Sequence, residues 1–170
     1  YVGNDPVSYI DPFGLKVCFK GNEAQRLADS TAAATGTTFD LDEDNCATNV
    51  RPIDDDWDDV SRGFTDLTDA EYTINLIYNV GGSANRAGRI EIDQGQIGRN
   101  YGTRFHRSYC TSSSGAVWSE PSIIAHELGH AHATMVQHIR GGDASNRIAI
   151  TWENSVHHTR GQPLRHLSCH

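Results

Sequence analysis

The eight residues from Ala125 to His132, AHELGHAH, contain an HExxH pattern. Positions four apart on an α-helix are separated by about 40° around its axis, so the imidazoles of His126 and His130 can reach one metal ion. Glu127 lies beside them and can take a proton from a water that the metal activates. The pattern therefore predicts a catalytic zinc site with His126 and His130 as ligands and Glu127 as the general base.

We expect this motif to lie on a helix with one packed face. An apolar stripe runs roughly opposite the two histidines, at Ile124, Leu128, Ala131 and Met135. The start signals of the helix stand at Ser119–Pro121, and Gly141–Gly142 would stop it. The alternative is a helix that merely carries two surface histidines.

A catalytic zinc ion usually has three protein ligands, so a third side chain is needed. His138 lies on the same expected helix, but the HExxHxxGxxH pattern fails because Ala133 and Val136 stand where Gly and His are required. Asp143 is better explained as the N-cap of a following helix. Neither residue is therefore preferred as the third ligand.

Glu153 is the preferred third ligand. It lies in the segment from Ala144 to Gly161, which has a helical pattern and a glycine stop. A carboxylate on a second, downstream helix completes a His2Glu site. The competing interpretation is an ordinary exposed helical glutamate.

The residues after this glutamate carry a further pattern: Glu153, Asn154, Gly161, Pro163 and Arg165. They resemble the EN…GxPxR signature that follows HExxH in Rhs-linked toxin tails and related secreted effector peptidases, and the resemblance covers roughly Ser122 to Arg165. It implies a gluzincin-like zinc metallopeptidase with Glu153 as ligand. The chain departs from the signature at His157, four residues after Glu153.

His157 and Arg165 are candidate catalytic residues. Either could stabilise an oxyanion or hold the ligand carboxylate, because both can present hydrogen-bond donors to the cleft. The alternative is that each is a cation that satisfies carbonyl groups at a helix end.

The first fifteen residues differ in character from the rest, with two Asp-Pro pairs and two glycines that favour extended chain and turns. The tract from Asn4 to Leu15 resembles the C-terminal end of the Rhs-repeat core. Its DPxGL element, Asp11–Leu15, belongs in that family to an aspartate autoprotease that cuts after the leucine. The resemblance implies two parts, 1–15 as the end of the Rhs core and 16–170 as the toxin domain; a plain turn segment is the alternative.

Together the two resemblances imply a bacterial toxin delivered into a target cell in interbacterial competition, through type VI secretion. The expected partners are the Rhs core shell with its secretion apparatus, a cognate immunity protein and a target protein substrate. Peptide bonds are the default substrate. The alternatives are a cell-wall amide hydrolase and a non-catalytic binding module with a structural zinc ion.

Two strands and two further helices are expected around the motif. Alternating apolar residues predict strands at Glu71–Val80 and Arg89–Asp93, and helix formers predict a helix from Gly21 to Ala34 with Asn22 as N-cap. A weaker helix includes Trp57 and Val60. We therefore expect an α+β, zincin-like fold with a small antiparallel sheet packed on the HExxH helix and the following ligand-bearing helix.

Composition limits the classes of partner. The chain has 170 residues, a formal net charge of −8 and a pI near 5.5, which disfavour binding to nucleic acid, as does the lack of a glycine-rich phosphate loop. It has no apolar run long enough for a membrane span and no signal-peptide pattern. The aspartates of 54–59 lack the pattern of a calcium loop and are expected to be a solvated helix start. The cysteines Cys18, Cys46, Cys110 and Cys169 leave disulfides and free thiols equally open.

Overall fold

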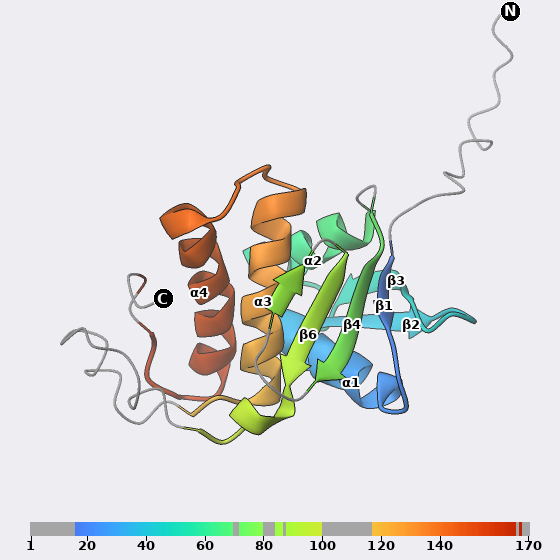
Figure 1. Ribbon diagram of the computed structural model, residues 1–170, viewed down its shortest axis with the longest axis horizontal. Helices are drawn as coiled ribbons and strands as arrows, with labels where there is room; N and C mark the ends of the chain where they lie inside the picture. Colours follow the sequence, from blue (N-terminus) through green and yellow to red (C-terminus); the bar gives the residue numbers. More distant parts are fainter. Residues whose placement is uncertain are drawn as a thin grey trace, which may run out of the picture.

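A computed structural model describes residues 16–69, 72–79, 84–86, 88–99, 117–165 and 167. The DPxGL element, Cys110, Cys169, and the proposed boundary after residue 15 lie outside these residues. The elements are β1 (Val17–Phe19), α1 (Ala24–Thr35), β2 (Thr37–Leu41), β3 (Ala47–Pro52), α2 (Asp59–Asp69), β4 (Ile74–Asn79), β5 (Ala84–Arg86), β6 (Arg89–Asp93), a 3-10 turn (Gln94–Gln96), α3 (Glu120–Met135) and α4 (Gly142–Thr159) (Figure 1). The expected α+β class is confirmed at this level.

The main sheet is mixed, with strand order β1-β4-β6-β5. Strand β4 pairs in parallel with both β1 and β6, and only the edge strand β5 runs antiparallel, against β6. The prediction of an antiparallel sheet was therefore wrong, although both predicted strands exist and do pair. Alternation of apolar residues determines which face of a strand is buried, but it carries no information on strand direction.

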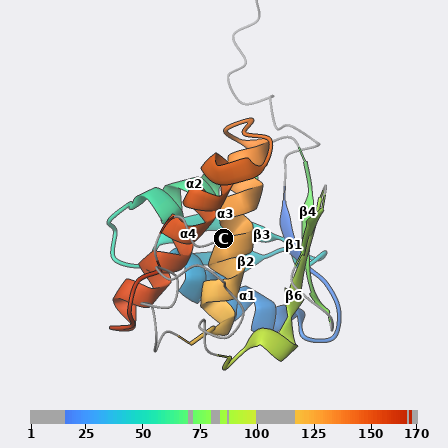
Figure 2. The same cartoon turned by 60° about the vertical axis from the view of Figure 1, so that its left-hand side comes forward.

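One face of this sheet packs against the helices. Ile74, Leu76, Ile90 and Ile92 are at most 1% exposed, whereas the intervening residues are less buried. Figure 2 shows β1, β4 and β6 nearly edge-on, with the helices on one side of them. The period-two pattern of the sequence thus corresponds to a core face, as expected for a sheet that is covered on one side.

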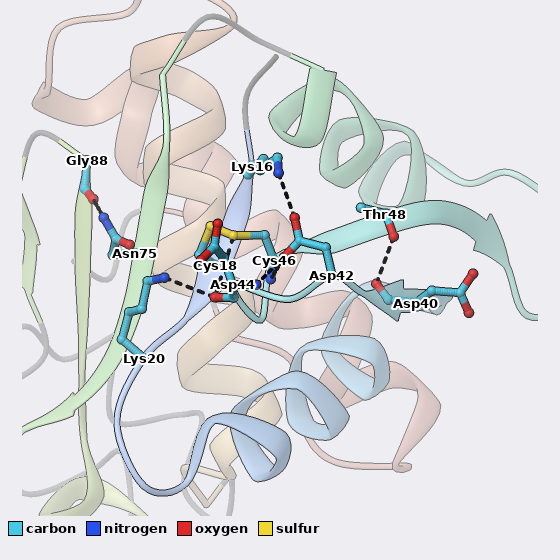
Figure 3. The surroundings of a disulfide bond; sticks show 10 residues. All are labelled: Lys16, Cys18, Lys20, Asp40, Asp42, Asp44, Cys46, Thr48, Asn75 and Gly88. Carbon is cyan, nitrogen blue, oxygen red and sulfur yellow. Dashed lines mark hydrogen bonds and ion pairs between the residues drawn. A yellow bond between two sulfur atoms is a disulfide. The ribbon is translucent and has the colours of Figure 1, made fainter. Parts of the chain in front are cut away.

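A disulfide joins the β2–β3 hairpin to the main sheet. Cys18, in β1, is bonded to Cys46, just before β3, and both are 2% exposed (Figure 3). The adjacent turn is held by Asp42, whose Oδ1 accepts from the backbone N–H of Cys46 and whose Oδ2 accepts from Lys16 Nζ at 2.6 Å. The bridge closes a loop across 28 residues of sequence separation. Such a loop contributes about 3–4 kcal/mol by constraining the unfolded chain.

Helix α3 begins where the sequence predicted. Ser119 is the N-cap, its side chain accepts from the Ser122 N–H, and Pro121 lies in the first turn. Glu120 is 8% exposed. Its carboxylate accepts from Arg26 Nη2 and Ser30 Oγ, both of α1, and from the Tyr78 hydroxyl of β4. These contacts fix the start of α3 against both α1 and the sheet.

The ends of the helices differ from the predictions by a few residues. Helix α3 ends at Met135, and a positive φ of 57° at His138 lies in the loop that follows. The glycine pair at 141–142 lies at the start of α4 and not at the end of α3, since Gly141 is the N-cap of α4. Both glycines adopt positive φ, which residues without a Cβ reach readily. Helix α1 has Glu23, not Asn22, at its N-cap.

The acidic tract at 54–59 is a solvated helix start, as predicted. Its five aspartates are exposed, and Asp58 Oδ1 accepts from the N–H groups of Val60 and Ser61 in the first turn of α2. Trp57 lies outside the helix and Val60 within it. Within the described part of the chain, no helix is both long and apolar enough to cross a membrane.

Candidate metal centre

Helices α3 and α4 pack with their backbones unusually close. A Cβ placed on Gly129 would lie 2.7 Å from Ala149 Cα and 3.2 Å from Ala149 N, closer than real side chains approach backbone. The glycine in HELGH is therefore required by the contact with α4. This close approach brings the histidine side chains of α3 within reach of polar side chains on α4.

A row of residues spaced four apart along α4 includes the partners of the motif histidines: Ser145, Ala149, Glu153 and His157. Each of these is at most 2% exposed. Spacing of four places the side chains in one row along a helix. The row therefore presents one hydroxyl, one carboxylate and one imidazole to the interior of the protein.

Each motif histidine is bonded to this row through the same ring atom. His126 Nδ1 lies 2.8 Å from Glu153 Oε2, and His130 Nδ1 lies 2.8 Å from Ser145 Oγ. The two imidazole centroids are 4.8 Å apart. A metal ion would thus be bound through the two Nε2 atoms, since both Nδ1 atoms already have oxygen partners on α4.

Glu153 is fully buried and is surrounded by donors. Its Oε2 also accepts from Arg165 Nη1 at 2.9 Å, and its Oε1 lies 3.4 Å from His157 Nε2. Burial by itself raises the pKa of this carboxyl, but the hydrogen bonds from His126 and His157 and the electrostatic interactions with His126 and Arg165 outweigh it and lower the pKa. Glu153 is therefore an anion held in place by its neighbours.

His157 and Arg165 both contact this carboxylate. His157 is 0% exposed, and its Nδ1 lies 2.7 Å from Gln162 Oε1. Arg165 is held by two hydrogen bonds between its backbone and the Asn154 side chain, both 2.7 Å. Of the two roles predicted for these residues, the geometry favours holding the carboxylate of Glu153 over stabilising an oxyanion.

Glu127 is 9% exposed, and this burial raises the pKa of its carboxyl. The electrostatic interaction with His126 lowers the pKa, and a smaller interaction with Glu153 raises it. A carboxylate with a raised pKa is a stronger base than one in water. The motif glutamate therefore has the environment that proton transfer requires.

The three predicted ligand residues lie close together, but their side chains are not arranged around one ion position. Glu153 meets His126 at Nδ1, the side of the ring away from Nε2, and the described residues contain no group of three His, Cys, Asp or Glu side chains that could hold a metal ion. His138 lies in the loop after α3, and Asp143 is exposed in the first turn of α4, whose N-cap is Gly141. The fit to zinc thus rests on two histidines and their partners.

Sequence reasoning missed two residues of this site, Ser145 and Gln162. Ser145 precedes Glu153 by two helical turns, so its place on the same face as the glutamate was available as a signal. Gln162 had no comparable signal because it lies in the irregular segment after α4.

Comparison of this chain with models of protein families, with curated proteins and with solved structures gives no match.

Proposed function

We propose that this domain is a zinc-dependent metallopeptidase with a zincin-like fold, in which His126 and His130 bind zinc and Glu127 is the general base. The observation that carries the proposal is the pair of histidine rings on α3, 4.8 Å apart, each with its Nδ1 bonded to an oxygen of α4. Such bonds select the tautomer in which Nε2 has the lone pair that a metal requires.

A bound zinc ion supplies Lewis acidity, which polarises a substrate carbonyl and lowers the pKa of water. The carboxylate of Glu127 takes the proton from the attacking water and delivers it to the leaving amine nitrogen of the cleaved peptide bond. The buried position of Glu127 raises the pKa of its carboxyl and so favours the first transfer, in which the carboxylate takes the proton. Peptide bonds in a target-cell protein are the proposed substrate.

The biological setting is part of the same proposal. The resemblance to Rhs-linked toxin tails supports a toxin that a bacterium delivers into a competitor, with an immunity protein in the producer. The Cys18–Cys46 disulfide supports exposure to an oxidising compartment at some stage, since disulfides persist where thiols are not kept reduced.

The test is the isosteric variant Glu127→Gln. Loss of general-base catalysis should lower the rate of peptide cleavage by about 10²- to 10⁴-fold, while zinc stays bound at one ion per chain. Glu43→Gln, at an exposed site in the β2–β3 loop, is the matched control and should leave the rate unchanged. A protein mixture and purified sacculi are the two substrates to compare. Full cleavage by Glu127→Gln, or activity only on sacculi, would contradict the proposal.

A further inference from the structure

The two nitrogens of an imidazole point to opposite sides of the ring. A side chain bonded to Nδ1 therefore lies away from an ion bound at Nε2 of the same ring. Glu153 Oε2 is bonded to Nδ1 of His126 and to Arg165, and Oε1 faces His157. Both of its oxygens thus have partners among the described residues.

We propose that Glu153 is a positioning residue, paired with Ser145, rather than the third zinc ligand. This inference rests on the proposed zinc site at His126 and His130. Glu153 accepts the Nδ1–H of His126, and Ser145 accepts the Nδ1–H of His130, so that α4 orients both rings toward one ion. Ser145 and Glu153 lie eight residues apart on α4, with Ala149 between them, whereas the two histidines lie four residues apart on α3.

The two halves of this arrangement differ in charge. The bond from His126 goes to a carboxylate and is charge-assisted, whereas the bond from His130 goes to a neutral hydroxyl, and charge-assisted bonds are roughly twice as strong. A carboxylate at Nδ1 also raises the basicity of the metal-binding nitrogen. Glu153 should therefore influence zinc binding more than Ser145 does.

Three further residues support the same arrangement, two of them through Glu153 and the third through His157. Arg165 and His157 hold the carboxylate of Glu153, and Gln162 Oε1 lies 2.7 Å from His157 Nδ1. The EN…GxPxR segment then acts as a support for His126 and not as a source of metal ligands.

The first experiment compares zinc affinities of Glu153→Gln, Ser145→Ala and His126→Ala by competition with a chromophoric chelator. An amide oxygen still accepts the Nδ1–H of His126, so Glu153→Gln should keep one zinc ion with an affinity lowered about 10- to 100-fold, and Ser145→Ala should lose less. Zinc loss in Glu153→Gln as large as in His126→Ala would overturn the inference.

A second measurement reads the hydrogen bonds directly, without activity. In ¹⁵N-histidine-labelled, zinc-loaded protein, the Nδ1–H proton of His126 should give a protected low-field signal. Glu153→Gln should shift this signal and leave that of His130 in place, and Ser145→Ala should do the reverse. An unchanged His126 signal in Glu153→Gln, or an unchanged His130 signal in Ser145→Ala, would contradict the inference.

The two proposals fail in different ways. If the wild-type domain binds no zinc, the proposed function fails and the inference fails with it. If the wild type binds zinc but Glu153→Gln behaves like His126→Ala, only the inference fails. Circular dichroism of each zinc-free variant checks folding. Should Glu153→Gln not fold, the Nδ1–H signal of His126 in the zinc-loaded wild type decides the question, and its absence would contradict the inference.

Discussion

Helix α3 carries histidines on two sides, and α4 contacts the two sides differently. On one side, His126 and His130 each have an oxygen of α4 at 2.8 Å from Nδ1. On the other side, His132 is 7% exposed and packs against Trp152, also of α4, with ring centroids 5.3 Å apart, yet neither of its ring nitrogens has a hydrogen-bond partner among the described residues. Its nearest charged partner is Asp66 Oδ2, 3.6 Å from Nε2.

The difference shows that burial and residue type do not by themselves make a metal site. His132 follows His130 by two residues in the same AHELGHAH segment, so composition alone does not separate them. What separates them is the oxygen at Nδ1, which selects the tautomer and orients the ring. Helix α4 supplies that oxygen to His126 and His130 but presents the Trp152 ring to His132.

The largest expected effect is on zinc binding. His126→Ala and His130→Ala each remove a proposed ligand and should weaken zinc binding by more than about 100-fold, beyond what loss of a supporting hydrogen bond costs. His132→Ala is the matched control and should bind zinc as the wild type does. The measurement is zinc content and competition affinity of the purified variants. Equal loss in His132→Ala would remove the distinction between the two sides.

A smaller effect is expected at the glycines that set the packing on each side. Gly129→Ala places a Cβ 2.7 Å from Ala149 Cα, and Gly63→Ala places one 2.4 Å from Trp152 Cζ2, beside His132. Overpacking should lower the free energy of unfolding by about 1–3 kcal/mol in each. This outweighs the roughly 1 kcal/mol gained from the higher helix propensity of alanine.

Only Gly129→Ala should also weaken zinc binding, since its Cβ meets the backbone of α4 between Ser145 and Glu153, whereas the Cβ of Gly63→Ala meets only side chains. Urea unfolding and zinc competition on the same samples test this pair. A Gly63→Ala variant that loses zinc affinity as strongly as Gly129→Ala would show that the two sides are not independent.

The smallest effect concerns pH. Burial lowers the pKa of His132 below its ordinary 6.5, against the opposing effect of Asp66. Below about pH 6.5, His132 is therefore protonated to a greater extent in the unfolded chain than in the folded protein. The free energy of unfolding consequently decreases as the pH falls. In urea unfolding from pH 7.5 to 5.5, His132→Gln should lose less stability than wild type. His158→Gln, at an exposed position of α4, should show the same pH dependence as the wild type. If the free energy of unfolding depended on pH in the same way in all three proteins, the attribution to His132 would be contradicted.

The elements that could be predicted were those with a strong local pattern. The start of α3 at Ser119, the strand Arg89–Asp93 and the helix that carries Glu153 follow from capping residues and apolar periodicity, which act over a few neighbouring residues. The short strand β1 and the β2–β3 hairpin had no such signal. Three apolar residues, as in β1, do not distinguish a strand from other buried chain.

For the site, the sequence alone determined the motif: two histidines four apart with a glutamate beside them on one helix, because helical geometry is local. The prediction of a single packed face was wrong, because residues 120–129 of α3 are all buried and the helix is covered on every side there. The sequence also placed Glu153 on a second helix. Only the tertiary structure decided which atom of His126 that glutamate meets, that Ser145 is the counterpart at His130, that Cys18 pairs with Cys46 and that β4 and β6 run in parallel. These depend on how distant segments pack, above all on the approach of Gly129 to Ala149, and no local spacing encodes that distance.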